Sequence, residues 1–208
     1  MLPSTNLSGV FSDAVAEHLA IIRWLSSQRK DFERAANLLC DCLRRNHKII
    51  WCGNGGSAAE AQHLAAELVG RFQRPRSPLP SIALTTDSSV LTAIANDFGF
   101  GQVFARQIDA LCQPGDAVVG ISTSGHSDNV RAALERARQL EAFTVAMTGE
   151  NGGPVTDCAD ICLRVPSSNP ARVQEGHILL GHMLCEHIDI ALAAEHQFEN
   201  AGALLDFA

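Results

Sequence analysis

Two polar loops in this chain carry the residue types that bind anions, and a histidine and a glutamate follow the first loop. That loop is Gly53-Asn54-Gly55-Gly56-Ser57, directly after the apolar run 48–52. Its glycines allow a tight turn close to a ligand, and Ser57 can cap a helix whose free N–H groups attract an anion. His63 and Glu67 lie four residues apart, so they share one face of that helix. The pattern predicts an anion site beside a metal-binding or proton-transfer pair.

The second loop, Ser122-Thr123-Ser124-Gly125-His126-Ser127, follows the apolar run 117–121 and precedes an amphipathic helix. Its hydroxyls and backbone N–H groups can bind phosphate oxygens without a lysine. Neither loop matches the common phosphate motifs, because no Gly-x4-Gly-Lys-Ser/Thr is present and Ala58 stands where Gly-x-Gly-x-x-Gly needs its last glycine. A polar capping loop is the alternative for either one, but two such loops after strands favour a phosphate site.

A long closing helix, about residues 171–194, adds two further candidate ligands, Gln174 and His182. With His63 and Glu67 they form a set of nitrogen and oxygen donors suited to Zn²⁺, although glutamine is an uncommon ligand. A core histidine and an exposed helix charge are the alternative for His63 and Glu67. In a regular helix, Gln174 and His182 are about 12 Å apart along the axis and about 80° apart around it. We therefore expect either an irregular closing helix or groups supplied by a neighbouring subunit.

After two N-terminal helices, about residues 12–45, short apolar runs alternate with helical patterns. Such alternation predicts a three-layer α/β/α domain, with a parallel sheet of five strands and helices on both faces. Ligands of such sheets bind beyond the carboxyl ends of the strands, where both polar loops fall. The segment 74–80 contains three prolines and is expected to be a loop. The expected strands are 48–52, 81–84, 117–121, 144–147 and 161–165, and the expected helices between them are 57–69, 89–96, 103–111 and 130–140.

Composition and charge limit the class of protein. At 208 residues, with 46% hydrophobic and 19% charged residues, the chain is long enough for one domain with a sizeable core. We divide it into N-terminal helices (1–46), an α/β core with the closing helix (47–195) and a tail (196–208). The net charge of −7, without a Lys/Arg-rich run, argues against nucleic-acid binding and favours a small ligand or protein partners. No apolar stretch approaches the ~20 residues that span a membrane, and no signal peptide is evident.

The seven cysteines are odd in number and include no Cys-x-x-Cys pair, so they predict neither a disulfide framework nor a cysteine zinc site. Cysteines in apolar surroundings behave as small hydrophobic side chains. A reducing cytoplasm is the simplest location for such a chain.

Taken together, these motifs resemble the phosphoheptose isomerases, a family of sugar-isomerase (SIS) domain proteins. The resemblance covers about residues 10–192 and implies a flavodoxin-like SIS domain that forms a homotetramer and binds one zinc ion per subunit. It also implies interconversion of sedoheptulose 7-phosphate and D-glycero-D-manno-heptose 7-phosphate, a step toward the heptose of bacterial lipopolysaccharide. The segments that carry the resemblance are 53–68, 82–87, 91–97, 120–125 and 172–177.

The resemblance assigns roles to individual residues. His63, Glu67, Gln174 and His182 match the family's zinc ligands. One departure is His126, where the family is expected to have asparagine. The expected substrate site includes Ser57 at the helix start and Arg71, which matches an arginine of the family's substrate site. The full set of expected substrate-site residues is Asn54, Gly55, Gly56, Ser57, Glu67, Arg71, Asn96, Asp97, Ser122, Thr123, Ser124, Ser127 and Gln174.

An aldose–ketose isomerase moves a proton between neighbouring carbons through an enediol, which needs a base and an acid. We assign Glu67 as the base and His182 as the acid, with the metal as a Lewis acid or orienting template. Two other functions stay open: a non-catalytic SIS protein that binds the bacterial replication initiator, and an isomerase of another sugar phosphate. The non-catalytic group is expected to lack the acid that corresponds to Glu67, so the presence of both Glu67 and His182 favours an enzyme.

Overall fold

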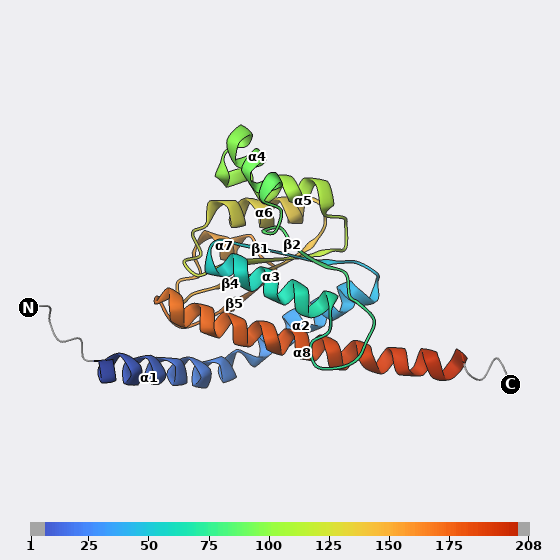
Figure 1. Ribbon diagram of the computed structural model, residues 1–208, viewed down its shortest axis with the longest axis horizontal. Helices are drawn as coiled ribbons and strands as arrows, with labels where there is room; N and C mark the ends of the chain where they lie inside the picture. The colour runs from blue at the N-terminus through green and yellow to red at the C-terminus, as the bar shows by residue number, and fades with distance from the viewer. Residues whose placement is uncertain (1–6, 204–208) are drawn as a thin grey trace, which may run out of the picture.

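The computed structural model describes the backbone of residues 7–203 and the side chains of residues 9–193. Its centre is a five-stranded parallel sheet in the order β2-β1-β3-β4-β5 (Figure 1), with strands β1 (Ile49–Gly53), β2 (Ser81–Ala83), β3 (Ala117–Ser122), β4 (Phe143–Thr148) and β5 (Ile161–Arg164). This is the strand order of flavodoxin-like sheets. The predicted fold class is therefore confirmed.

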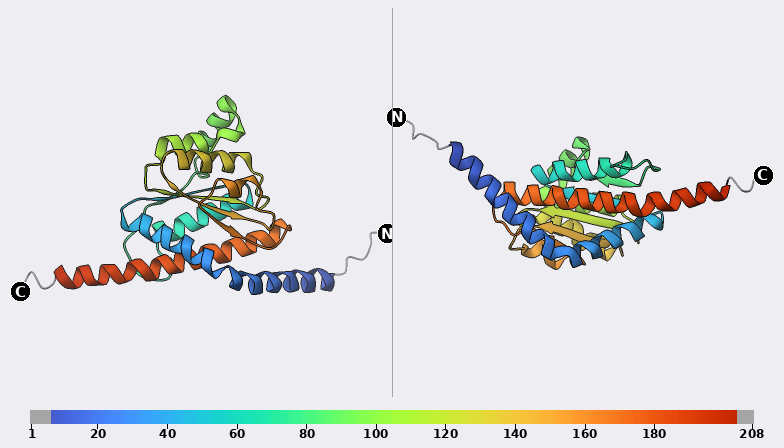
Figure 2. Two further views of the ribbon diagram at one scale, coloured as in Figure 1. Left: turned by 180° about the vertical axis from the view of Figure 1, so that it is seen from behind. Right: turned by 90° about the horizontal axis from the view of Figure 1, so that it is seen from below.

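Helices form the two outer layers on either side of the sheet (Figure 2). They are α1 (Leu7–Leu25), α2 (Arg29–Arg44), α3 (Gly56–Val69), α4 (Ser88–Phe98), α5 (Ala105–Leu111), α6 (Asp128–Gln139), α7 (Gly153–Asp157) and α8 (Pro170–Ala203), with 3₁₀ turns η1 (Ser26–Gln28) and η2 (Phe100–Gln102). One face of the sheet packs against α2, α3 and α8, and the other packs against α5 and α6. In Figure 1, α8 crosses the bottom of the molecule and α4 projects at the top.

Strand β1 shows how both faces of the sheet are covered. Ile49 and Trp51 contribute to the core on the side of α3 and α8, while Ile50 and Cys52 contribute to the core on the side of α6. All five residues of the strand are buried. A parallel strand covered on both faces has an uninterrupted apolar sequence instead of an alternating one, so the short apolar runs are the appropriate signal for these strands.

Helix α8 is one continuous helix that extends past its predicted end at Ala194 to Ala203. Its backbone covers part of the segment 196–208, and residues 204–208 lie outside the described residues. Since the helix continues through Gln174, an irregular closing helix does not explain how Gln174 and His182 could share a site. Helix α7 is absent from the sequence prediction, because its five residues are too few to show a helical period.

Residues 7–203 include no helix with both the length and the apolar composition needed to cross a bilayer. The seven cysteines all lie in this part of the chain and form no disulfide there. Burial raises the pKa of Cys52 and of Cys185 to about 12, and the nearby charge of Glu67 adds to the shift at Cys185. Both thiols are therefore protonated and unreactive in the native protein at neutral pH.

Candidate active site

The loop after β1 brings the backbone to the start of α3 in a tight turn. Gly55 adopts φ = +55°, a left-handed conformation that favours glycine. A Cβ atom on Gly56 would lie 2.1 Å from Nε2 of Gln174, so the absence of a side chain lets the amide of Gln174 reach the first turn of α3. Ser57 is buried in this first turn and does not cap the helix as expected, because the N-cap position is Gly55, where the cap has no side-chain hydrogen bond. The structure thus places Gln174 next to the predicted anion loop.

The loop after β3 is ordered by its own polar groups. The Oγ atoms of Ser122 and Ser127 lie 2.9 Å apart, and the backbone N–H of Gly125 donates to Ser122 Oγ at 3.1 Å. Nδ1 of His126 lies 2.7 Å from the carbonyl oxygen of Ser124. A carbonyl oxygen can only accept, so we assign the hydrogen to Nδ1. The histidine at the expected asparagine position therefore braces the loop backbone.

A reciprocal pair of amides joins the two loops. Nδ2 of Asn54 donates to Oδ1 of Asn129 at 2.8 Å, and Nδ2 of Asn129 donates to Oδ1 of Asn54 at 2.9 Å. Asn129 is buried in the first turn of α6. The sequence analysis identifies Asn54 but not Asn129, because a pairing across 75 residues has no local signal. Residues 54–57, residues 122–127 and Gln174 are termed the anion end below.

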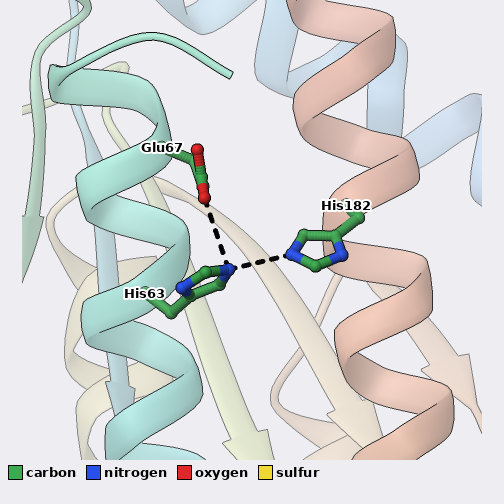
Figure 3. A group of neighbouring side chains, drawn as sticks. All are labelled: His63, Glu67 and His182. Atoms are coloured by element: carbon green, nitrogen blue, oxygen red, sulfur yellow. Dashed lines mark hydrogen bonds and ion pairs between the residues drawn. The ribbon is translucent and has the colours of Figure 1, made fainter. Parts of the chain in front are cut away.

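His63, Glu67 and His182 come together where α3 faces α8 (Figure 3), and they are termed the reactive cluster below. Their candidate ligand atoms all lie within 4.8 Å of one another. Nε2 of His63 is 2.8 Å from Nε2 of His182 and 3.4 Å from Oε1 of Glu67. Phe72, just beyond α3, stacks on His182 with 5.4 Å between ring centroids. The sequence analysis missed Phe72, since an aromatic residue in a loop has no distinctive signal.

Close packing of α3 against α8 positions the reactive cluster. A Cβ atom on Gly181 would lie 2.6 Å from the methyl carbons of the buried Leu64, so a side chain at Gly181 would force Leu64 or the helices to shift. Gly56 meets Gln174 near one end of the helix pair, and Leu64 meets Gly181 further along both helices. The two helices therefore run parallel, and His182 directly follows Gly181, where α8 packs against Leu64.

The donors of the reactive cluster fit a zinc ion or a similar divalent cation. Two imidazole nitrogens and a carboxylate oxygen are common zinc ligands. Two nitrogen ligands of a tetrahedral zinc ion lie about 3.3 Å apart, so the rings of His63 and His182 would separate by about 0.5 Å. The side chain of His63 is 47% exposed, which leaves room for this adjustment and for access by a substrate.

One chain does not bring every predicted residue to the reactive cluster. Asn96 and Asp97 are exposed at the end of α4, where Nδ2 of Asn96 donates to Oδ1 of Asp97 at 2.7 Å. Figure 1 shows α4 and α8 on opposite sides of the molecule. Arg71 is exposed four residues beyond Glu67, directly after α3. The roles of these residues stay predictions.

The fold and the site define an α/β protein with an anion end beyond its strands and a nitrogen–oxygen donor cluster on its helices. The family model of the SIS domain matches residues 11–149. This match covers the first four strands of the sheet and both polar loops. It agrees with the class that the geometry indicates.

Individual relatives define a narrower family. The chain is 49% identical over 180 residues to the phosphoheptose isomerase of Aquifex aeolicus (strain VF5), covering 86% of this chain and 93% of the relative. It is 51% identical over 173 residues to that of Roseiflexus sp. (strain RS-1), covering 83% and 88%. The structure of phosphoheptose isomerase GmhA from Neisseria gonorrhoeae matches with a TM-score of 0.84 at 42% identity, over 88% of this chain and 99% of that one. The chain therefore belongs to the phosphoheptose isomerase family of SIS-domain proteins and is a sugar-phosphate isomerase, which confirms the predicted family and enzyme class.

Proposed function

We propose that the chain interconverts sedoheptulose 7-phosphate and D-glycero-D-manno-heptose 7-phosphate, on the way to the heptose of bacterial lipopolysaccharide. The observation that carries this proposal is the placement of the anion end and the reactive cluster along one pair of parallel helices. Gly56 and His63 are seven residues apart on α3, or about 10 Å along the helix axis. A substrate held at both places needs a comparable distance between its phosphate and its reacting carbons. A long sugar phosphate meets this requirement better than a short one.

The reactive cluster supplies the groups for proton transfer. Oε1 of Glu67 faces His63, so we assign Oε2 as the atom that removes the proton from the carbon beside the carbonyl. His182 supplies a proton at the other carbon, and Phe72 stacks on its ring and limits its orientation. Acid and base thus approach the substrate from two helices, and an enediol intermediate needs both groups.

We propose that His63, Glu67, Gln174 and His182 hold Zn²⁺. A divalent metal bound there polarises the substrate carbonyl and orients the reacting carbons. Within one chain the amide of Gln174 lies at the first turn of α3, and α8 is continuous. This separation favours a neighbouring copy as the source of Gln174 in any one metal site.

The anion end is assigned to the phosphate. The hydroxyls of residues 122–127 and the backbone N–H groups of Gly55 and Gly56 bind its oxygens, because a helix start and hydroxyl donors both favour an anion. Binding energy from the phosphate then positions the reacting carbons. Asn54 and Arg71 are assigned to the sugar hydroxyls.

We propose that the protein is a cytoplasmic homotetramer. Helix α4 has no buried residue, and α1 exposes apolar side chains at helical spacing, including Phe11, which is 73% exposed, Val15 and Leu19. Exposed apolar stripes of this kind favour association. A neighbouring copy can then bring Asn96 and Asp97 of α4 to a site. Light scattering should give four times the chain mass of 22.3 kDa, and a mass of one chain would contradict the assembly.

The activity is tested by following sedoheptulose 7-phosphate by NMR, with metal analysis of the same sample. We expect conversion to the aldose and about one zinc ion per chain. The free heptulose should react poorly, because the binding energy of the phosphate is missing. Faster turnover of a shorter ketose phosphate would support an isomerase of another sugar phosphate. No turnover of the heptulose phosphate by zinc-loaded protein would overturn the proposal.

A further inference from the structure

The segment after α3, residues 71–80, crosses to α8 and carries a buried ion pair. The side chains of Arg76 and Asp189 are both 0% exposed, and Nε of Arg76 donates to Oδ1 of Asp189 at 2.6 Å. Oδ2 of Asp189 accepts hydrogen bonds from the backbone N–H groups of Gln73 and Arg74 at 2.8 and 3.0 Å. Asp189 therefore fixes the backbone of this segment as well as its arginine.

The other nitrogens of Arg76 cap the end of α3. Nη2 donates to the carbonyl oxygen of Glu67 at 2.9 Å, and Nη1 donates to that of Leu68 at 2.8 Å. The last carbonyl groups of a helix have no partner within the helix. Arg76 supplies that partner at the residue that bears the proposed base, so the backbone of Glu67 is linked through Arg76 to Asp189.

Asp189 and the segment that it binds are also linked to His182. Asp189 follows His182 by seven residues on α8, which is about 10 Å along the axis and only about 20° around it, so both lie on one helix face. Phe72, from the segment that Asp189 holds, stacks on the His182 ring. One short segment therefore contacts the backbone of Glu67 and the ring of His182.

Stability alone does not account for a buried pair of this kind. Desolvation of two charges is costly, and apolar side chains of similar volume often give equal or higher stability. Burial raises the pKa of Asp189, but hydrogen bonds from Arg74, Gln73 and Arg76 outweigh it and lower the pKa below 3.8. Apolar side chains could fill the space, but they could not bind the carbonyl and N–H groups that define where α3 ends.

We propose that Arg76 and Asp189 form a positioning pair for the isomerisation, which sets Glu67 of α3 against His182 of α8. Neither side chain is assigned a contact with the substrate. The proposal rests on the proposed function, in which Glu67 and His182 exchange protons with the sugar.

The chain offers a matched control for this pair. The side chain of Asp116 is 1% exposed and, like Asp189, accepts from two backbone N–H groups, those of Lys48 and Gln113, and from a cationic side chain, Nζ of Lys48 at 2.6 Å. Nδ1 of His47 also lies 3.7 Å from its Oδ1. Asp116 directly precedes β3, at the amino end of the sheet and away from the reactive cluster. Asp116→Asn therefore makes the same chemical change as Asp189→Asn at a place without a positioning role.

The experiment measures kcat, KM and zinc affinity for the full-length wild type, Asp189→Asn, Arg76→Lys and Asp116→Asn. Arg76→Lys keeps the charge pair but loses the planar set of five donors, so it decides the question if Asp189→Asn does not fold. We expect kcat and zinc affinity to fall about 10–100-fold in the variants of the pair, as for other residues that orient metal ligands. KM should change less than about threefold, because the anion end is intact. Asp116→Asn should keep wild-type kcat in the temperature range where it is folded.

Two buried thiols report whether the helices separate locally. Cys185 lies on α8 between His182 and Asp189, and Cys52 lies in β1 on the other side of the sheet. Iodoacetamide labelling followed by mass spectrometry should show faster modification of Cys185 than of Cys52 in Arg76→Lys. Equal acceleration of both thiols indicates global unfolding instead of local separation and contradicts the proposal.

Wild-type kcat and zinc affinity in Arg76→Lys would overturn the positioning role. A loss in Asp116→Asn as large as that in Asp189→Asn would also overturn it, because the effect would then follow stability alone. If the wild type binds zinc but turns over no heptulose phosphate, the proposed function fails, and zinc affinity still decides the role of the pair. If the wild type does neither, the labelling ratio decides it.

Discussion

Asp116 and Asp189 are buried carboxylates with the same kinds of partner in two regions of one molecule. Asp116 joins the starts of β1 and β3, so its hydrogen bonds close the amino edge of the sheet. Asp189 joins α8 to the segment that caps α3, and these two helices carry the reactive cluster. The two carboxylates have similar partners but connect different elements, so we expect only the pair between α3 and α8 to affect the reactive cluster.

The largest effect should come from removing the base that Asp189 helps to position. Glu67→Gln should lower kcat about 10²–10⁴-fold without loss of fold. Adding Asp189→Asn to Glu67→Gln should then cost less activity than Asp189→Asn costs the wild type, because one of the two groups that the pair positions is gone. Turnover of the single and double variants by NMR, with circular dichroism as the folding control, checks both statements. A Glu67→Gln enzyme with a tenth of wild-type activity or more would rule out this base.

The second largest effect should be on KM, and it should distinguish the role of the anion end from the roles of Asp116 and Asp189. Ser124→Asp places a negative charge in the loop assigned to the phosphate, and like charges in a binding site cost several kcal/mol. KM should therefore rise at least about tenfold, with a smaller change in zinc affinity, which is the opposite of the pattern expected for Asp189→Asn. Ser124→Ala is the control for loss of the hydroxyl alone. An unchanged KM in Ser124→Asp would place the phosphate elsewhere.

A third change alters the packing of α8 on α3 and leaves both carboxylates in place. Gly181→Ala puts a methyl group where Leu64 packs, and overpacking of this kind costs about 1–3 kcal/mol. The melting temperature and the zinc affinity should both fall. Gly101→Ala is the matched control, since a Cβ there has no atom within 4 Å. Equal melting temperatures for the two variants would show that the contact between α3 and α8 accommodates the extra methyl group, which contradicts the prediction.

The smallest effect should be on the stability of the protein at low pH. Because the folded-state pKa of Asp189 is lowered, its contribution to stability is complete above the unfolded pKa and is lost as pH falls through the folded value. Between about pH 5 and pH 3, the wild type should therefore lose more stability than Asp189→Asn. Urea unfolding at several pH values measures this, and parallel pH profiles for the two proteins would contradict it.

Local patterns were sufficient to predict the architecture and to place two members of the reactive cluster on one face of a helix. The short apolar runs specify the strands, and glycine and hydroxyl-rich loops mark the carboxyl ends of β1 and β3. The proximity of His63 and Glu67 could be predicted because a helix brings residues four apart to one face. His182 was predicted as a site residue because histidine is a common metal ligand and because it matches a ligand of the family.

The supporting contacts were not predictable because their partners are distant in sequence. Arg76 and Asp189 are 113 residues apart, and each alone has the appearance of an ordinary charged residue. The segment 74–80 contains three prolines and is correctly predicted to be a loop. No local signal shows that it caps α3 and binds Asp189 of α8. Gly181 is similar, since only the position of Leu64 reveals why a side chain is excluded there.

The paired amides of Asn54 and Asn129 have a consequence for the chemical ageing of the enzyme. Asn54 precedes Gly55, and asparagine before glycine is prone to lose ammonia and become aspartate. Aspartate at this position would lose the N–H group that Asn129 accepts and place two oxygen acceptors face to face. The bridge between the anion loops would then lose one of its two hydrogen bonds and gain a repulsion between two oxygen atoms. Loss of activity in storage should therefore follow the deamidation of Asn54 and not that of Asn151, the other asparagine that precedes a glycine. Peptide mass spectrometry alongside KM can distinguish the two.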